Sequence, residues 1–238
     1  MTHHIRTASA LILDMDGVIV DTEPLHVESF RIFLKRRNIV ASENFLLALI
    51  GHSVEENMRE IYRAFFRARE QDLENDVRER EIIYLDLLQR TNIEPRPGLE
   101  DVIAYCKRKG IALALASSSI REQITTILDK LNIQSANSFS YHKVFSVIVS
   151  GEDVARKKPA PDIYLRALEQ LGVNKSRCVA VEDSPAGVQA AKAAGIKCAA
   201  ARTDYVAPER LETADAIISS LVELPALLER FIFNKSGA

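Results

Sequence analysis

Five short apolar runs, separated by stretches with helical periodicity, constrain what this chain of 238 residues can fold into. Each run is almost continuously apolar, which is typical of strands that are covered on both faces of a sheet. Strands that alternate with helices predict an α/β fold with a doubly wound parallel sheet. The predicted strands are residues 10–13, 111–116, 144–149, 178–181 and 196–201, and the predicted helices between them are residues 99–109, 120–131, 162–171 and 185–194.

The interval between the first two runs breaks this alternation, because it contains helical patterns and no convincing strand. Its clearest pattern is an apolar stripe along one face of residues 54–69. The sequence EPRPG at 94–98 then ends helical structure with two prolines and a glycine. We therefore predict a core domain of residues 1–20 and 92–238 with an inserted all-helical domain of residues 21–91. The helices predicted in the insertion are residues 25–37, 43–49, 54–69 and 77–89.

The composition argues against several classes of protein. The 31 Lys and Arg residues nearly balance 33 Asp and Glu residues, so a formal charge of -2 gives no general attraction to nucleic acid or an anionic membrane. No apolar run approaches the length of a membrane span, and the N-terminus lacks a hydrophobic signal core. Cys106, Cys178 and Cys198 are far apart among apolar neighbours, as buried thiols of a reducing compartment are. We expect a cytoplasmic protein without nucleic-acid or membrane partners, and a monomer by default.

Charged and polar side chains follow the predicted strands at the points where the strands end. Because ligands collect at the carboxyl ends of parallel strands, we expect these side chains to converge on one edge of the sheet. They are Asp14 and Asp16 after the first run, Ser117 after the second, Lys158 some residues after the third, and Glu182 and Asp183 after the fourth.

Each of these side chains suits phosphoryl transfer. A carboxylate such as Asp14 is ionised at neutral pH and forms a reactive acyl phosphate, which divides one difficult displacement into two easier ones. A carboxylate also repels a phosphate dianion, and a hard cation offsets this repulsion. Mg²⁺ prefers oxygen ligands, which Asp14 and Asp183, supported by Glu182, can supply. Lys158 can neutralise nucleophile and phosphate, and Ser117 with the amides beyond it can bind phosphate oxygens.

Two helix-start patterns divide the roles of neighbouring residues. Ser119 and Glu122 have the spacing of a capping box, which predicts that Ser119 caps a helix and leaves Ser117 available to a ligand. Ser184 is a predicted N-cap with Pro185 at the first helical position, so the two acidic residues before it should lie in the loop.

Four motifs in order resemble those of the haloacid dehalogenase superfamily. The sequence DMDGVIVDT at 14–22 matches the D-x-D-G-x-x-x-D first motif, Ser117 the second, Lys158 the third, and Glu182 with Asp183 the fourth. The resemblance covers nearly the whole chain. It is closest to the phosphatase and beta-phosphoglucomutase-like members, which combine a Rossmann-like core with a helical cap inserted after the first strand.

By this resemblance Asp14 is the nucleophile, and Asp16 is the general acid and base and also offers its backbone carbonyl to Mg²⁺. An alkoxide leaving group needs a proton, whereas a halide does not. Dehalogenases of this superfamily lack the second aspartate. The presence of Asp16 is therefore evidence against dehalogenation. The resulting candidates are the catalytic residues Asp14, Asp16, Ser117 and Lys158, the substrate-binding residues Ser117, Ser118, His26, Lys158 and Arg80, and the metal ligands Asp14, Asp16, Glu182 and Asp183.

Some assignments stay open on the sequence alone. Asp21 is either functional or only an acidic residue at a helix start. Glu182 is either a metal ligand or a support for the ligands. His26 is either an inert helix-surface residue or, as in mutases of the resembling group, a contact of the second aspartate in the first motif. Arg80 reaches a substrate only if its helix borders the cleft, and only the resemblance selects Lys158 over the lysine before it.

The predicted function is magnesium-dependent hydrolysis of a small phosphate monoester, a sugar phosphate by preference, through an aspartyl-phosphate. The nearest alternative is a beta-phosphoglucomutase, but the mutases have a cap loop of the form G-V-S-R where this chain has GHSV at 51–54, so Val54 replaces the phosphate-binding arginine. A phosphonatase needs a cap lysine, and Lys35 in a basic run is a weak candidate. A non-catalytic binding protein would be expected to lose Asp14 or Asp16, and both are present.

Overall fold

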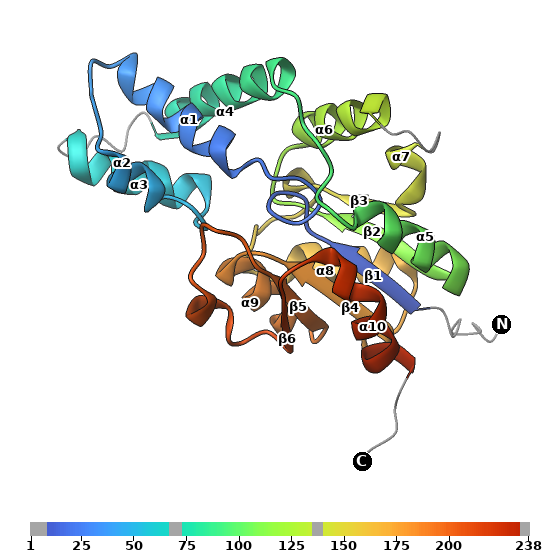
Figure 1. The fold of residues 1–238 in the computed structure, drawn as a ribbon. Helices are drawn as coiled ribbons and strands as arrows, with labels where there is room; N and C mark the ends of the chain where they lie inside the picture. The colour runs from blue at the N-terminus through green and yellow to red at the C-terminus, as the bar shows by residue number, and fades with distance from the viewer. Residues whose placement is uncertain (1–8, 67–72, 135–139, 234–238) are drawn as a thin grey trace. The chain divides into compact units, whose positions relative to one another are not determined.

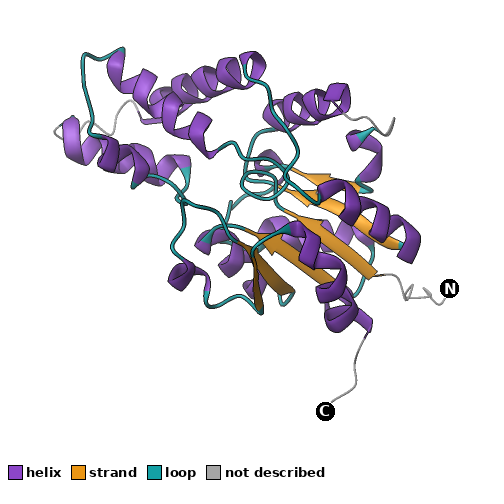
Figure 2. Cartoon of the chain, viewed as in Figure 1, coloured by secondary structure: helices purple, strands orange, loops and turns teal. Residues whose placement is uncertain are grey.

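The computed structural model describes residues 9–66, 73–134 and 140–233. These residues form two compact units: one contains the chain up to residue 21 and from residue 93 onward, and the other contains residues 22–92. Figure 1 shows the elements of both units, and Figure 2 shows their secondary structure. Among the described residues, the strands belong to the first unit, and the second is built from helices.

The first unit is built on a parallel sheet of six strands in the order β3-β2-β1-β4-β5-β6, which confirms the predicted doubly wound α/β fold. The strands are β1 (Ser9–Leu13), β2 (Ile111–Ala116), β3 (Val147–Val149), β4 (Cys178–Glu182), β5 (Lys197–Ala201) and β6 (Ala216–Ile218). The helices of this unit are α5 (Leu99–Lys109), α6 (Arg121–Gln134), α7 (Tyr141–Val144), α8 (Asp162–Leu171), α9 (Pro185–Ala193) and α10 (Leu224–Leu228). The short helical turns are η2 (Gly151–Asp153), η3 (Lys175–Arg177), η4 (Pro208–Leu211), η5 (Leu221–Glu223) and η6 (Glu229–Phe233).

The third and sixth strands differ from the sequence-based prediction. Residues 144–149 were expected to form one strand, but Val144 ends helix α7, whose first residue, Tyr141, is fully buried. Ser140 accepts hydrogen bonds from the amides of Lys143 and Val144, and this turn leaves only Val147–Val149 for β3. The edge strand β6 was not predicted, because three residues are too few to form a recognisable apolar pattern.

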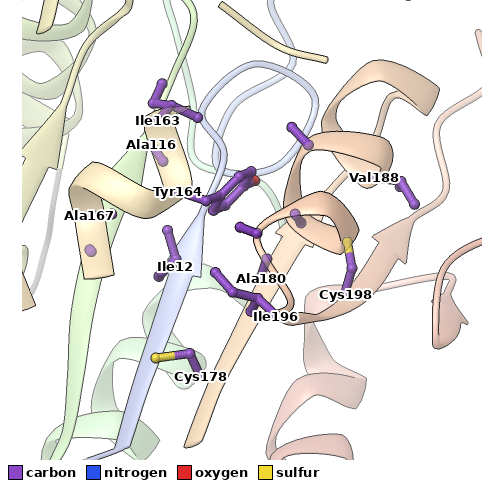
Figure 3. Packing of buried hydrophobic residues seen from close by; sticks show 14 of the residues in the cluster. Ile12, Ala116, Ile163, Tyr164, Ala167, Cys178, Ala180, Val188, Ile196 and Cys198 are labelled. Carbon is purple, nitrogen blue, oxygen red and sulfur yellow. The ribbon is translucent and has the colours of Figure 1, made fainter. Parts of the chain in front are cut away.

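Small side chains on one face of the sheet allow helices α8 and α9 to pack closely against it. Alternate strand residues meet Ile163, Tyr164 and Ala167 of α8 and Val188 and Ala191 of α9 in one buried cluster (Figure 3). The strand residues of this cluster include Ala10, Ile12, Ala114, Ala116, Cys178, Ala180, Cys198 and Ala200. The three cysteines of the chain are buried free thiols, as expected.

The sheet register brings the ends of the central strands together. Leu13 of β1 pairs with Leu115 of β2 and with Val181 of β4. The amide of Asp14 donates to the carbonyl of Val181 at 3.0 Å, and the amide of Ser117 continues the ladder onto β3 in the same way. The residues that follow β1, β2 and β4 therefore start from one edge of the sheet.

The second unit contains α1 (Glu23–Lys35), α2 (Glu43–Leu47), α3 (Val54–Phe65) and α4 (Leu73–Arg90). Helix α1 packs along α4, and α3 begins with a capping box between Ser53 and Glu56. The predicted helix at 54–69 ends beyond the described part of this segment, so its last three residues lie outside the description. No helix in the described ranges is long and apolar enough to cross a membrane.

Candidate active site

Lys158 connects the ends of three neighbouring strands. Its ammonium nitrogen lies 2.6 Å from Asp14 Oδ1, 2.6 Å from Glu182 Oε1 and 2.9 Å from the carbonyl oxygen of Ala116. Asp14 follows β1, Ala116 ends β2 and Glu182 ends β4. All three charged residues are buried, so their interactions are only weakly screened by solvent.

Two glycines allow the acidic loops to approach each other. Gly17 has a φ of 75°, and a Cβ at this position would lie 1.9 Å from Asp183 Oδ2. The turn at Gly17 is held from outside by Arg96, whose guanidinium donates to the Gly17 carbonyl at 2.6 Å. A Cβ at Gly187 would lie 1.8 Å from Glu182 Oε2. The absence of a side chain at both positions thus makes room for the two carboxylates.

Glu182 is the last residue of β4, and of the two acidic residues predicted to lie in the loop before α9 only Asp183 does so. Ser184 is the N-cap of α9, its hydroxyl accepts from the amide of Gly187 at 3.1 Å, and Pro185 is the first helical residue. Glu182 is fully buried, and the hydroxyl of Tyr164 donates to its Oε1. Burial raises the pKa of Tyr164 well above its ordinary value, so this phenol remains a hydrogen-bond donor.

Ser119 contacts the site and does not form the predicted capping box. Its hydroxyl donates to Asp16 Oδ2 at 3.0 Å, and its amide donates to Ser117 Oγ at 3.1 Å. Helix α6 instead begins at Arg121, whose amide donates to Glu152. The capping prediction was wrong because the Ser-x-x-Glu spacing describes only the local sequence. It does not show that the hydroxyl of Ser119 donates to Asp16, a carboxylate that follows a different strand.

The buried surroundings shift the pKa of both Asp14 and Lys158. Burial and then the carboxylate of Glu182 raise the pKa of Asp14 to about 8, although Lys158 acts in the opposite direction. Burial alone would lower the pKa of Lys158, but the carboxylates of Asp14 and Glu182 outweigh it and raise that pKa. Lys158 therefore stays charged, whereas Asp14 holds a proton more readily than an exposed aspartate does.

The chemistry of the donor set fits a hard divalent cation. Asp14, Glu182 and Asp183 each offer a carboxylate oxygen, and these oxygens all lie within 4.8 Å of one another. Among the described ion pairs, Lys158 is the cation that contacts these carboxylates, so the cluster carries more negative than positive charge. Glu182 Oε2 is buried and has no hydrogen-bond partner within the described part of the chain. An excess of buried carboxylate oxygens is the environment that Mg²⁺ occupies in proteins.

The two candidate substrate-binding residues of the helical unit contact each other. Arg80 is fully buried, its guanidinium bonds His26 Nδ1 and Glu81, and it lies over the rings of Phe30 and Tyr84. The ring of His26 stacks on Tyr84 with centroids 4.0 Å apart. This burial does not favour direct contact of Arg80 with a ligand. The substrate-binding roles of both residues, and that of Ser118, stay predictions.

Ser119 and Tyr164 are site contacts that the sequence did not reveal as such. Ser119 was assigned to a helix cap, and Tyr164 lies inside the apolar pattern of a predicted helix, where a tyrosine is usually a core residue. The only available signal was their position, since Ser119 lies two residues after Ser117 and Tyr164 lies six residues after Lys158.

The parallel sheet with buried carboxylates and a lysine at its carboxyl edge defines the class of the protein, an α/β enzyme with a Rossmann-like core. The model of the haloacid dehalogenase-like hydrolase family matches residues 11–201, and the chain belongs to this family. The family and the enzyme class that the four motifs predicted are thereby confirmed.

Several relatives are similar over most of their length. Protein CbbY of Cereibacter sphaeroides is 32% identical over 92% of this chain and 94% of its own. A phosphorylated carbohydrates phosphatase of Thermotoga maritima is 33% identical over 79% of this chain and 82% of its own. The crystal structure of a CbbY mutant from Rhodobacter sphaeroides in complex with xylulose-(1,5)bisphosphate has a TM-score of 0.75 and 30% identity, covering 91% of this chain and 96% of that one.

Proposed function

We propose that the protein is a magnesium-dependent phosphatase that hydrolyses a small phosphate monoester, a sugar phosphate, through an aspartyl-phosphate on Asp14. One observation carries the proposal: a buried carboxylate that follows the central strand is paired with Lys158 at 2.6 Å and lies beside the carboxylates of Glu182 and Asp183. The groups to which the proposal assigns the roles of nucleophile, phosphate-binding cation and metal ligands are thus adjacent.

The side chains of this chain would divide the reaction into two displacements. Asp14 attacks phosphorus through a carboxylate oxygen, the bond from phosphorus to the ester oxygen breaks, and Asp16 gives the leaving oxygen its proton. Asp16 then takes a proton from water, which attacks phosphorus and releases inorganic phosphate from Asp14. Lys158 offsets the charge of nucleophile and phosphate throughout, and Ser117 with the following amides binds phosphate oxygens.

Asp14, Asp183 and the backbone carbonyl of Asp16 would hold Mg²⁺, with Glu182 as a ligand or a support. The bound cation supplies charge that offsets the repulsion between carboxylate and phosphate. The helical unit of residues 22–92 would be the cap that selects the substrate. We also retain the expectation of a monomeric cytoplasmic enzyme without nucleic-acid or membrane partners.

The relatives support a phosphorylated sugar as the substrate class. One is a phosphatase of phosphorylated carbohydrates by name, and a solved CbbY structure holds a sugar bisphosphate. A phosphate-release screen over sugar, polyol and nucleoside monophosphates, with and without Mg²⁺, tests the proposal. Release from one or more sugar phosphates only in the presence of Mg²⁺ is expected, and a screen without release from any ester would contradict it.

Chelation is expected to silence the enzyme, and added Mg²⁺ should restore it. Asp183→Ala should raise the Mg²⁺ requirement or remove activity, because the variant loses a carboxylate from the cluster. Metal ligands must be deprotonated and the pKa of Asp14 is about 8 without a cation, so Mg²⁺ binding should weaken as the pH falls below about 8. Titration calorimetry at several pH values measures this. Full activity in chelator would refute the metal site.

Hydrolysis should prevail over phosphosugar isomerisation. In a mutase a cationic clamp must hold the distal phosphate of a bisphosphate, but Val54 is the first residue of α3 and Ser53 is its cap, so neither offers a cation. The buried Arg80 is already bonded to His26 and Glu81. Phosphorus NMR on beta-glucose 1-phosphate with a trace of the 1,6-bisphosphate should therefore show inorganic phosphate as the main product. Rapid accumulation of glucose 6-phosphate would establish the mutase instead.

A further inference from the structure

Tyr164 contacts both members of the ion pair that lies beside the proposed nucleophile. Its hydroxyl donates to Glu182 Oε1, and the centroid of its ring lies 5.5 Å from Lys158 Nζ. The side chain is fully buried and lies at the carboxyl end of β1 (Figure 3). A phenol hydroxyl and a ring face of the same residue thus meet a carboxylate and an ammonium group, respectively.

Glu182 depends on Tyr164 because few donors reach it. Its carboxylate is fully buried, and the donors that the structure places on Oε1 are Tyr164 and Lys158. Its Oε2 packs against Gly187 and has no hydrogen-bond partner among the described residues. A buried carboxylate that loses one of its donors is less well stabilised, and that donor no longer fixes its orientation.

Lys158 transmits the position of Glu182 to Asp14. The ammonium nitrogen is shared at 2.6 Å by Glu182 Oε1 and Asp14 Oδ1 and is held from a third side by the carbonyl of Ala116. A displacement of Glu182 therefore changes the balance of forces on the lysine that orients the carboxylate of Asp14. The same displacement moves one of the three oxygens that form the acidic cluster.

We propose that Tyr164 is a positioning residue of the active site, which fixes the carboxylate of Glu182 and thereby keeps Lys158 on Asp14. The consequence for turnover and for Mg²⁺ rests on the proposed function of this site, whereas the consequence for geometry does not. The alternative role is that of an ordinary core tyrosine of α8, which would matter only for stability.

Tyr164→Phe separates these roles, because it removes the hydroxyl and leaves the packed ring in place. The matched control is Tyr141→Phe: Tyr141 is equally buried in the same unit, and its hydroxyl lies 3.5 Å from Glu100 and not at the site. The measurements are a crystal structure of each variant, its melting temperature, its Mg²⁺ dissociation constant by titration calorimetry, and the kcat and KM for the best substrate of the screen.

We expect Tyr164→Phe to move the carboxylate of Glu182 and to lengthen its contact with Lys158. Loss of a group that orients metal ligands should weaken Mg²⁺ binding and lower kcat, each by about tenfold or more, with a smaller change in KM. Tyr141→Phe should leave these quantities within about twofold of wild type, with a melting temperature similar to that of Tyr164→Phe.

The outcomes of the two proposals are distinguishable. A Tyr164→Phe structure in which Glu182, Lys158 and Asp14 have not moved overturns the positioning role, whether or not the wild type proves to be a phosphatase. An equal loss of melting temperature and activity in both tyrosine variants also overturns it, since stability alone would then explain the effect. A wild type that neither binds Mg²⁺ nor releases phosphate refutes the proposed function, while the crystal structures still decide the role of Tyr164.

Discussion

Asp14→Asn is expected to abolish turnover, by roughly a millionfold as for the loss of other covalent nucleophiles, while the fold remains intact. An amide does not attack phosphorus, and it supplies no negative charge to a cation. The fold should tolerate the change, because an amide oxygen can still accept a hydrogen bond from Lys158, which also keeps its contacts with Glu182 and the carbonyl of Ala116. Rapid-quench labelling with phosphorus-32 substrate measures the acyl phosphate directly.

The matched control for this variant is Asp21→Asn in the same loop. Asp21 is exposed, and its Oδ2 accepts a hydrogen bond from the hydroxyl of Tyr205 at 3.2 Å. The control should keep activity within a few-fold of wild type and should label normally. Labelled protein in a quenched Asp14→Asn sample would show that another residue is the nucleophile.

Asp16→Ala is expected to slow turnover by about a hundredfold to ten-thousandfold, the range typical of a lost general acid and base. The loss should depend on the leaving group, because an alkoxide must be protonated as it departs and a nitrophenolate need not be. Comparison of kcat for a sugar phosphate and for p-nitrophenyl phosphate measures this dependence under steady-state conditions. A loss that is equal for both esters would argue against protonation of the leaving group by Asp16.

Ser119→Ala is the control for the orientation of Asp16. The hydroxyl of Ser119 donates to Asp16 Oδ2 at 3.0 Å, so this variant removes one hydrogen bond and keeps the acid. The expected loss in kcat is about tenfold, which corresponds to the lower end of the range for a hydrogen bond to a charged group, about 1.5–3 kcal/mol. An Asp16→Ala variant that loses no more activity than Ser119→Ala would not support a chemical role for Asp16.

The sequence predicted the α/β core because its strands are long enough to show continuous apolarity and its helices show a clear period. The runs at β1, β2 and β4 begin and end within one residue of their predicted positions. The prediction was weaker where tertiary packing decides. Residues 141–144 form a helix whose Tyr141 is buried in the core, and the three residues of β6 form a strand by pairing with β5.

The candidate site was predictable where side chains follow strands and less so where partners come from elsewhere. Asp14, Lys158, Glu182 and Asp183 were named from the sequence, and the structure brings these four close together. The contact between Ser119 and Asp16 joins residues 103 positions apart, and no local spacing encodes it. The burial of Arg80 likewise follows from the packing of α1 against α4, which helical periodicity alone does not specify.

The central position of β1 affects how the chain can fold. This strand is synthesised well before its neighbours in the sheet, β2 and β4, because Ser9 lies opposite Ile111 and Ala10 lies opposite Cys178. The helical unit of residues 22–92 is synthesised between β1 and its first partner, and it forms a compact unit by itself. We therefore expect slow, non-local assembly of the sheet after fast formation of the helices. Until β2 emerges from the ribosome, the apolar segment SALIL has no strand to pair with and is a natural target for a chaperone.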